Sequence, residues 1–208
     1  MKYILTVLLF TTGICFAQEP LDLLLKGVTE RDVKTVSDLV RRGMSPDSAD
    51  PKGNTLLQMS ARTGDLPMVN ALLGFRANPK LLNALGESAL MLAAVEGHTA
   101  VARRLIEAGS EVNASGWSAL HYAAWRTHVD VCKLLLENGA DIDARGPNGI
   151  TPVMMAVRSG DLETVKLLVW EVADLSFETI DGSTALSWAE KFGYGEIAQH
   201  LRNAGARK

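Results

Sequence analysis

The four histidines are the first candidates for site chemistry in this 208-residue chain, because an imidazole can act as a general base or as a metal ligand. His98 and His128 lie 30 residues apart, and Asp130 follows the second of them closely. A metal site would need a further ligand at suitable spacing, and the sequence offers none. We therefore predict no metal site, and we expect both histidines to pack at the starts of helices.

The common catalytic motifs are absent from the sequence. It contains no phosphate-binding GxxxxGK[ST], no GxSxG, no HExxH and no CxxC pair. Asp65 and Asp161 follow breaks between apolar runs, where a carboxylate stabilises the positive end of the next helix. An active site around Arg126, His128 and Asp130 is the enzymatic alternative, but nothing in the pattern supplies a cleft for it. We predict that the chain is not an enzyme and uses no cofactor.

Composition limits the class of protein. The chain is 47% hydrophobic, which is enough for a substantial core in one domain. Its formal net charge of −3 argues against a nucleic-acid-binding domain, which is usually basic. We therefore expect no nucleic-acid partner.

The first 17 residues have the pattern of a secretory signal peptide. Met1-Lys2 is a short positive region, an uncharged apolar run follows from Tyr3 to Phe16, and Ala17 precedes the predicted cleavage point. An uncleaved N-terminal anchor is the alternative, although the run is short for a membrane span. Lipidation at Cys15 is rejected, because the preceding Ile14 fits the lipoprotein pattern badly.

Export would leave a mature chain, residues 18–208, with a single cysteine. Cys132 then has no internal disulfide partner, and its apolar helical setting predicts a small buried side chain. Together with the short signal, this favours a bacterial periplasm, with no membrane attachment after cleavage. The triplet Asn113-Ala114-Ser115 is formally a glycosylation site and counts against that location, but such a short pattern often arises by chance.

Five segments of the chain repeat one another. Each begins at a Ser or Thr, continues as TLLQMSA, SALMLAA, SALHYAA, TPVMMAV or TALSWAE, and is followed by a second apolar run. The starting residues are Thr55, Ser88, Ser118, Thr151 and Thr184, with spacings of 33, 30, 33 and 33. Nine residues after four of these starts a Gly ends the first run, and Thr127 holds that place in the other unit.

Each repeat predicts two short helices. The initial Ser or Thr can cap the first helix, and Pro152 suits a first helical position because its missing N–H is not needed there. Helices this short are marginal alone, so every unit must bury its apolar faces against its neighbours. The sequence therefore predicts an all-α solenoid.

The segment Ser118–Ala124, SALHYAA, and the unit end Asn138–Asp141, NGAD, resemble the ankyrin-repeat family. The resemblance covers about residues 21–208 and implies stacked helix-turn-helix units joined by short loops, here called fingers. It also implies that His121 hydrogen-bonds to neighbouring backbone. We predict six units, the outer two acting as caps, with approximate bounds 21–50, 51–83, 84–113, 114–146, 147–179 and 180–208.

The chain departs from the family pattern at a few places. The spacing of 30 before Ser118 removes three residues from the finger at 113–116, so we expect that finger to be truncated. Thr127 replaces the glycine between two helices, while Arg76 and Val172 replace the glycine at the end of their units. Because β-branched residues resist positive φ, we expect Thr127 and Val172 to alter their turns most.

The resemblance places the usual contact surface on the concave face. This face is built from the residue after the finger glycine, the last two residues of the first helix and the residue before the terminal glycine. Trp and Arg at these places are typical of interface hot spots. The predicted partner-binding residues are Trp117, Trp125, Arg126, Asn138, Arg62, Phe75 and Arg158. The alternative is that the tryptophans pack against adjacent units or cover the shortened finger.

The function we expect is a non-catalytic scaffold, monomeric when free, that binds a partner protein through this groove in the periplasm. An accessory role in envelope or oxidative-stress defence is one possibility. The other is an immunity or inhibitor protein that covers the active site of a secreted toxin. An acidic inhibitor would pair with a basic enzyme, but the mature charge of −4 is too small to decide between them.

Overall fold

The computed structural model describes the backbone of residues 12–207 and the side chains from Pro20 to Arg207. Within these residues the chain forms twelve α-helices, and its β-structure is limited to two isolated bridges, which confirms the all-α prediction. The helices are α1 (Thr12–Thr29), α2 (Val33–Arg41), α3 (Leu56–Arg62), α4 (Leu66–Gly74), α5 (Ala89–Val95), α6 (Thr99–Glu107), α7 (Ala119–Trp125), α8 (Val129–Glu137), α9 (Pro152–Ser159), α10 (Leu162–Trp170), α11 (Ala185–Lys191) and α12 (Gly195–Asn203). One 3₁₀ turn, Pro147–Gly149, lies in a finger.

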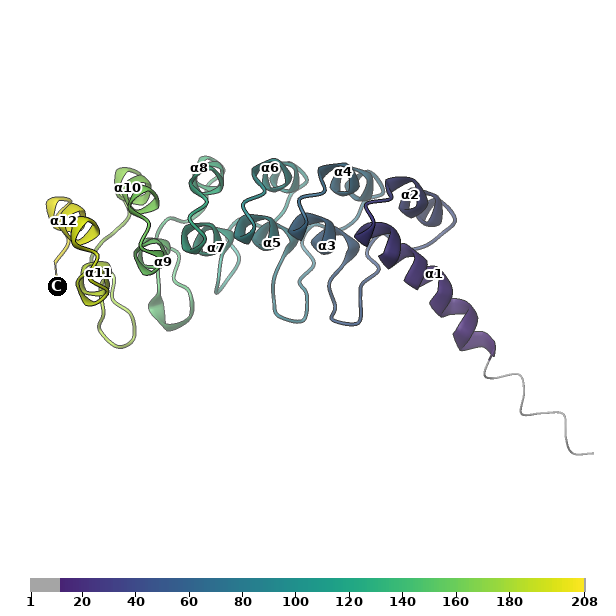
Figure 1. The fold of residues 1–208 in the computed structure, drawn as a ribbon, viewed down its shortest axis with the longest axis horizontal. Coiled ribbons are helices and arrows are strands. Elements are labelled where there is room, and N and C mark those ends of the chain that lie inside the picture. The colour runs from purple at the N-terminus through teal and green to yellow at the C-terminus, as the bar shows by residue number, and fades with distance from the viewer. Residues whose placement is uncertain (1–11, 208) are drawn as a thin grey trace, which may run out of the picture.

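The helices stack as successive pairs along one axis. In Figure 1 the even-numbered helices form one row, the outer row, and the odd-numbered helices form a second, inner row, with the fingers projecting from the inner row. Each helix contacts its partner in the pair and the equivalent helix of the next pair. The fold is thus the helical solenoid predicted from the repeats.

The core runs along the whole stack. Small residues let the inner helices approach closely, and Ala93, Ala94, Ala123 and Ala124 are fully buried. Leucines from both rows fill the remaining space, each contributing on the order of 2 kcal/mol by burial. Because each unit covers only its neighbours, stability arises from the interfaces between units.

The five predicted hydroxyl residues occupy the N-cap positions of the inner helices, and three of them cap through their side chains. Thr55, Ser88 and Thr184 accept hydrogen bonds from backbone N–H groups three residues later, at 3.2, 3.2 and 3.1 Å. Ser118 differs, since its Oγ lies 2.8 Å from His121 Nδ1. Thr151 precedes the proline that opens α9, and its buried hydroxyl has no partner among the described residues.

The prediction that Thr127 and Val172 alter their turns is wrong. Thr127 has a φ of 62°, in the same left-handed region as the equivalent Gly97 at 77° and Gly160 at 74°. Val172 has a φ of 68°, against 87° at Gly109 and 79° at Gly139. Arg76 behaves alike, with a φ of 64°. The stack fixes the turn, and the non-glycine residues bear a local strain of about 1–2 kcal/mol each.

The neighbouring unit decides where a side chain fits in these turns. A Cβ on Gly97 would lie 2.6 Å from the His128 ring of the following unit, so only glycine fits. Thr127 faces no such ring, because the equivalent residue of its following unit is Asp161, whose carboxylate accepts the Thr164 N–H at 2.9 Å. The same glycine-to-ring packing joins Gly64 to His98, and Gly160 to Tyr194.

The finger between α6 and α7 is visibly shorter than its neighbours (Figure 1). In the finger before α5, the Asn83 N–H donates to the Glu87 carbonyl at 3.0 Å, and no equivalent bond joins Asn113 to Trp117 among the described residues. Asn113 instead donates to the Gly139 carbonyl and accepts from the Asp141 N–H, both at 2.8 Å. The truncation predicted from the spacing is therefore present.

The predicted signal peptide, residues 1–17, lies largely outside the described residues. Residues 1–11 are not described, and α1 starts at Thr12. Cleavage after Ala17 and the rejected lipidation of Cys15 concern side chains that also fall outside the description. None of the described helices combines the length and apolarity needed to cross a membrane.

Candidate protein-binding surface

The ends of the inner helices present one repeated pair of residues. In each of the last five units, two residues at the end of the inner helix were predicted as contacts. The first of these two, the end residue, shares a helical face with the residue three positions before it. We call this face, together with the residue that directly follows each end residue, the inner surface. Its pairs are Met59 and Arg62, Leu92 and Val95, Tyr122 and Trp125, Met155 and Arg158, and Trp188 and Lys191. Leu92 and Met155 are buried and the other three earlier residues half-buried, so they form a floor below the end residues, which are exposed except for the half-buried Val95.

Trp125 and Arg126 are the most prominent residues of this surface. Trp125 ends α7 and exposes 41% of its surface, while the Arg126 guanidinium lies 5.7 Å from the centre of its ring. Such an arrangement allows a cation–π contact and leaves both side chains reachable from solvent. The structure therefore places two of the predicted contact residues together, in the middle of the stack.

Trp117 is packed differently. Its ring meets that of His121 edge-on, with centroids 5.3 Å apart, and a Cβ on Gly146 would lie 3.0 Å from it. The indole is half-buried between its own unit and the next finger, as the packing alternative anticipated for this residue. Its part in partner binding stays a prediction.

His121 is a structural residue. It is fully buried, its Nδ1 accepts from the Ser118 N–H at 3.2 Å, and its Nε2 donates to the Ile150 carbonyl at 3.0 Å. Burial lowers the pKa of His121, because desolvation disfavours the charged ring. The predicted hydrogen bonding to neighbouring backbone is confirmed.

The N-terminal part of the inner surface is polar and partly enclosed. Arg62 forms an ion pair with Glu87 at 3.5 Å, and Asn83 donates to the same carboxylate at 2.8 Å. Burial raises the pKa of Tyr122, and the negative charge of Glu87 adds to the shift. A hollow of about 240 Å³ adjoins this pair, lined by Asp50, Lys52, Asn54, Gln58, Met59, Arg62, Thr63 and Leu92.

Two predicted contact residues lie away from this surface, at the ends of outer helices. Phe75 follows α4, and the Arg41 guanidinium lies 5.7 Å from the centre of its ring. Asn138 follows α8 and donates to the Leu134 carbonyl at 2.8 Å. The structure therefore divides the predicted set between the two rows, since Arg158 lies with Trp125 and Arg126 at the ends of inner helices.

Positive charge collects on the central and C-terminal inner surface. Arg126, Arg158 and Lys191 are exposed at the ends of three successive inner helices. In the described part of the chain none of the three forms an ion pair, whereas Arg62 does. A partner that covers this region would need negative charge to match them.

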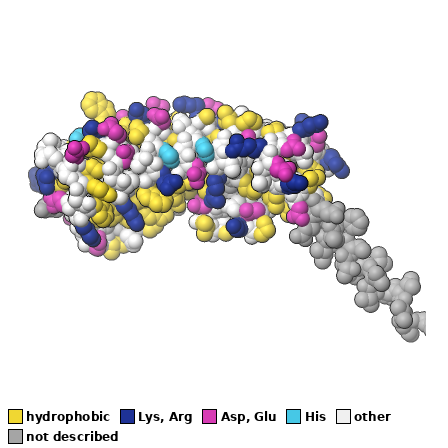
Figure 2. Space-filling view, viewed as in Figure 1, with side chains coloured by type: hydrophobic (Ala, Val, Ile, Leu, Met, Phe, Trp, Pro, Cys, Tyr) yellow, Lys and Arg dark blue, Asp and Glu magenta, His cyan; other side chains and the backbone are white. Residues whose placement is uncertain are grey.

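An aromatic cluster extends the inner surface at its C-terminal end, and sequence reasoning missed it as a unit. The rings of Trp188 and Phe192 are 6.1 Å apart, and those of Phe192 and Tyr194 are 6.0 Å apart. Figure 2 shows hydrophobic side chains gathered around α9 and α11, with charged ones spread over the whole face. A signal for the floor residues was present in the sequence. Residues three positions apart share a helical face, so Tyr122 could have been assigned to the same surface as Trp125.

The other candidate residues for chemistry have structural roles. His98 Nε2 and His128 Nε2 each lie 3.1 Å from a backbone carbonyl of the preceding unit, those of Arg62 and Val95. Both histidines stand at helix starts, as predicted. The described residues contain no cluster of three side chains able to hold a metal. Burial raises the pKa of Cys132 to about 12, so its thiol stays protonated.

Comparisons with known proteins agree with this geometry. A family model described as ankyrin repeats in three copies matches residues 24–113 and 57–146, and a second, ankyrin repeats in many copies, matches residues 126–169. The chain is 34% identical over 83 residues to Notch-regulated ankyrin repeat-containing protein B of Danio rerio, covering 40% of this chain and 75% of that protein. It is 33% identical over 81 residues to Notch-regulated ankyrin repeat-containing protein of Homo sapiens, covering 39% and 71%.

Proposed function

Because the chain belongs to the ankyrin-repeat family, we propose that it is a non-catalytic scaffold that binds a partner protein through the inner surface, centred on Trp125 and Arg126. The observation that carries the proposal is the 41% exposure of Trp125 beside an exposed arginine, in the middle of the stack. A large amphipathic ring held by a rigid helix loses little conformational freedom on binding, which favours it as an anchor.

The charges of the inner surface define the partner's chemistry. Arg126, Arg158 and Lys191 lie on adjacent inner helices without ion pairs among the described residues. A partner that places acidic side chains beside an apolar patch would match both these cations and the Trp125 ring. The proposed partner surface is therefore acidic and apolar.

The setting we propose is the bacterial periplasm, reached through the signal peptide predicted at residues 1–17. Support for export comes from the sequence of this segment, with its positive start and uncharged apolar run. In that compartment the scaffold would serve envelope or oxidative-stress defence.

The second candidate function is an immunity protein that neutralises a toxin. Mass spectrometry of the protein recovered from the periplasmic fraction of an expressing bacterium tests export, since cleavage leaves Gln18 as the first residue.

A pull-down from the periplasmic fraction tests binding. The wild-type chain is compared with Trp117→Ala/Trp125→Ala, and with Leu85→Ala/Ile180→Ala as a control that removes two exposed apolar side chains outside the inner surface. We expect one protein to be retained by wild type and control and lost with the double variant. Equal retention by all three, with melting curves showing every variant folded, would contradict the proposal.

A further inference from the structure

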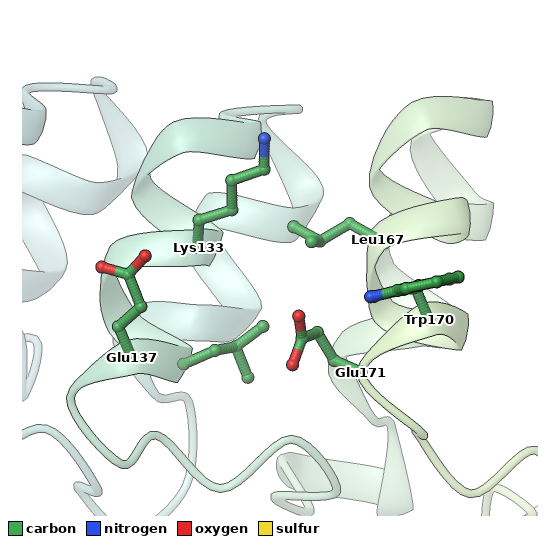
Figure 3. Close-up of a pocket in the computed structure, with 6 residues that line it drawn as sticks. Lys133, Glu137, Leu167, Trp170 and Glu171 are labelled. Atoms are coloured by element: carbon green, nitrogen blue, oxygen red, sulfur yellow. The ribbon is translucent and has the colours of Figure 1, made fainter.

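A second surface with a distinct composition lies in the outer row, between α8 and α10. It is a groove of about 330 Å³ lined by Lys133, Leu136, Glu137, Leu167, Trp170 and Glu171. Figure 3 shows these side chains rising from the two facing helices, with the indole nitrogen of Trp170 directed towards the space between them. None of the residues lies on the inner surface.

Packing alone does not account for the residues beside this groove. Trp170, which lines the groove, exposes 82% of its surface, and Val172, which lines a separate hollow with Val169 and Ala204, exposes 81%. Val172 also has a φ of 68°, at the unit end where Gly109 and Gly139 stand in other units. A β-branched residue there is strained and gains no burial in return, so neither side chain stabilises the fold. An exposed apolar ring that lines a groove, as that of Trp170 does, is typical of a binding site.

The lining of the groove combines an apolar floor with unpaired acids. Leu136 and Leu167 are half-buried and belong to the packed layer of the stack. In the part of the chain that the structure describes, neither Glu137 nor Glu171 forms an ion pair, although Glu163 on the same face pairs with Lys166 at 2.8 Å. Figure 3 shows the Glu171 carboxylate pointing into the space beneath Leu167. The groove therefore offers apolar contact and negative charge together.

We propose that this groove binds an arginine side chain of a partner protein. The aliphatic stem of the arginine would lie on Leu136 and Leu167, and its guanidinium would donate to Glu137 and Glu171. The Trp170 N–H would donate to a backbone carbonyl of the same partner segment. The occupant thus carries an apolar stem, a cation and an adjacent main-chain acceptor.

Arginine fits better than the other candidate side chains. A purely apolar residue would leave two carboxylates desolvated without a partner, which is unfavourable. A lysine ammonium is a compact, strongly hydrated charge, whereas the planar guanidinium has five donors and can serve two carboxylates from different helices at once. Lys133 is the competing internal cation, and Figure 3 shows its ammonium directed away from both acids.

The test is a titration of the full chain with synthetic peptides, followed by NMR of the Trp170 indole N–H. The peptides are acetyl-Ala-Leu-Arg-Leu-Ala-amide and versions with lysine, citrulline or leucine in place of arginine. Citrulline keeps the shape of arginine without its charge. We expect saturable shifts with the arginine peptide, weaker binding of lysine, and binding of citrulline reduced by about tenfold or more, as the loss of charge-assisted hydrogen bonds implies.

Variants of the chain separate the groove from the inner surface. Glu137→Gln/Glu171→Gln should reduce arginine-peptide binding by about tenfold, whereas Lys133→Gln should preserve or strengthen it. Trp125→Ala should leave it unchanged, so failure here is distinguishable from failure of the inner-surface proposal. Equal binding of the leucine or citrulline peptide, no binding of any peptide, or self-association of the chain that Trp170→Ala abolishes would each overturn the proposal.

Discussion

Gly97→Ala is the substitution that most directly tests how adjacent units fit together. The added Cβ would lie 2.6 Å from two atoms of the His128 ring, a distance that real Cβ atoms do not reach. The ring would have to move away, and the hydrogen bond from its Nε2 to the Val95 carbonyl, at 3.1 Å, would lengthen or break. One methyl group therefore disturbs an interface between units.

The expected loss of unfolding free energy has two parts. Placing a side chain at φ 77° costs about 1–2 kcal/mol. Losing the histidine hydrogen bond adds about 1 kcal/mol. Gly109→Ala is the matched control, because Gly109 also has a positive φ, 87°, but has no atom within 4 Å of an added Cβ. The entropy that any Gly→Ala change removes from the unfolded chain is common to both variants.

Urea unfolding followed by circular dichroism measures the difference between the two variants. Because both variants share the cost of a positive φ, we expect Gly97→Ala to be less stable than Gly109→Ala by about 1 kcal/mol. Adding His128→Asp to Gly97→Ala should recover about that difference, because the shorter side chain relieves the clash and can accept the backbone N–H three residues later, as Asp161 accepts that of Thr164. Equal losses in the two single variants, or no rescue by the second substitution, would refute the packing argument.

Three further predictions follow from single side chains. Trp125→Ala should weaken partner binding by at least ~2 kcal/mol while the melting curve stays that of a folded chain; unfolding of the variant would assign the ring to the core. Because the pKa of His121 is lowered in the folded chain, its contribution to stability is complete above about pH 6.5 and is lost as the pH falls towards the folded value. His121→Gln should remove that pH dependence with little loss at pH 8, since Gln58 occupies the same position in another unit and donates to two backbone carbonyls, at 2.9 and 3.0 Å. Cys132 should react with a thiol reagent only as fast as the chain unfolds, because it is fully buried and its pKa is about 12; rapid labelling of native protein would contradict this.

The helices and their starts were predictable because their causes are local. A hydroxyl residue before an apolar run at helical spacing favours the start of a helix at that point. All five predicted starts, from Thr55 to Thr184, are the N-caps of inner helices. The period of 33 then required adjacent pairs to stack, because no pair could bury its apolar faces alone.

The turns were not predictable from one unit, because their tolerance depends on the next. Thr127 is β-branched, and such a residue disfavours a positive φ. The stack nevertheless enforces the turn, and Asp161 leaves room for the Thr127 side chain. A signal does exist in the sequence. Where the following unit has His or Tyr at the facing place the turn residue is glycine, and where it has Asp the residue is Arg31 or Thr127.

The sequence predicted which repeat positions the residues of the candidate site occupy, but not how far their side chains are exposed to solvent. The positions of Trp117 and Trp125 within the repeat were read correctly, yet one ring packs over Gly146 while the other ends a helix in solvent. That difference arises from the backbone of the next finger, which no spacing within a unit encodes. Trp170 likewise gave no clear indication in sequence, because its 82% exposure depends on the groove between α8 and α10.

Net charge is a poor guide to the partners of a molecule shaped like this one. The whole chain carries −3, which would favour basic partners. The inner surface nevertheless presents Arg126, Arg158 and Lys191, and the outer groove presents Glu137 and Glu171. At physiological salt, charges further apart than about 8 Å are largely screened, so a partner responds to the surface it touches rather than to the sum. An acidic partner on the inner surface and an arginine in the outer groove are therefore compatible on one chain, and neutralising one surface should leave binding at the other intact.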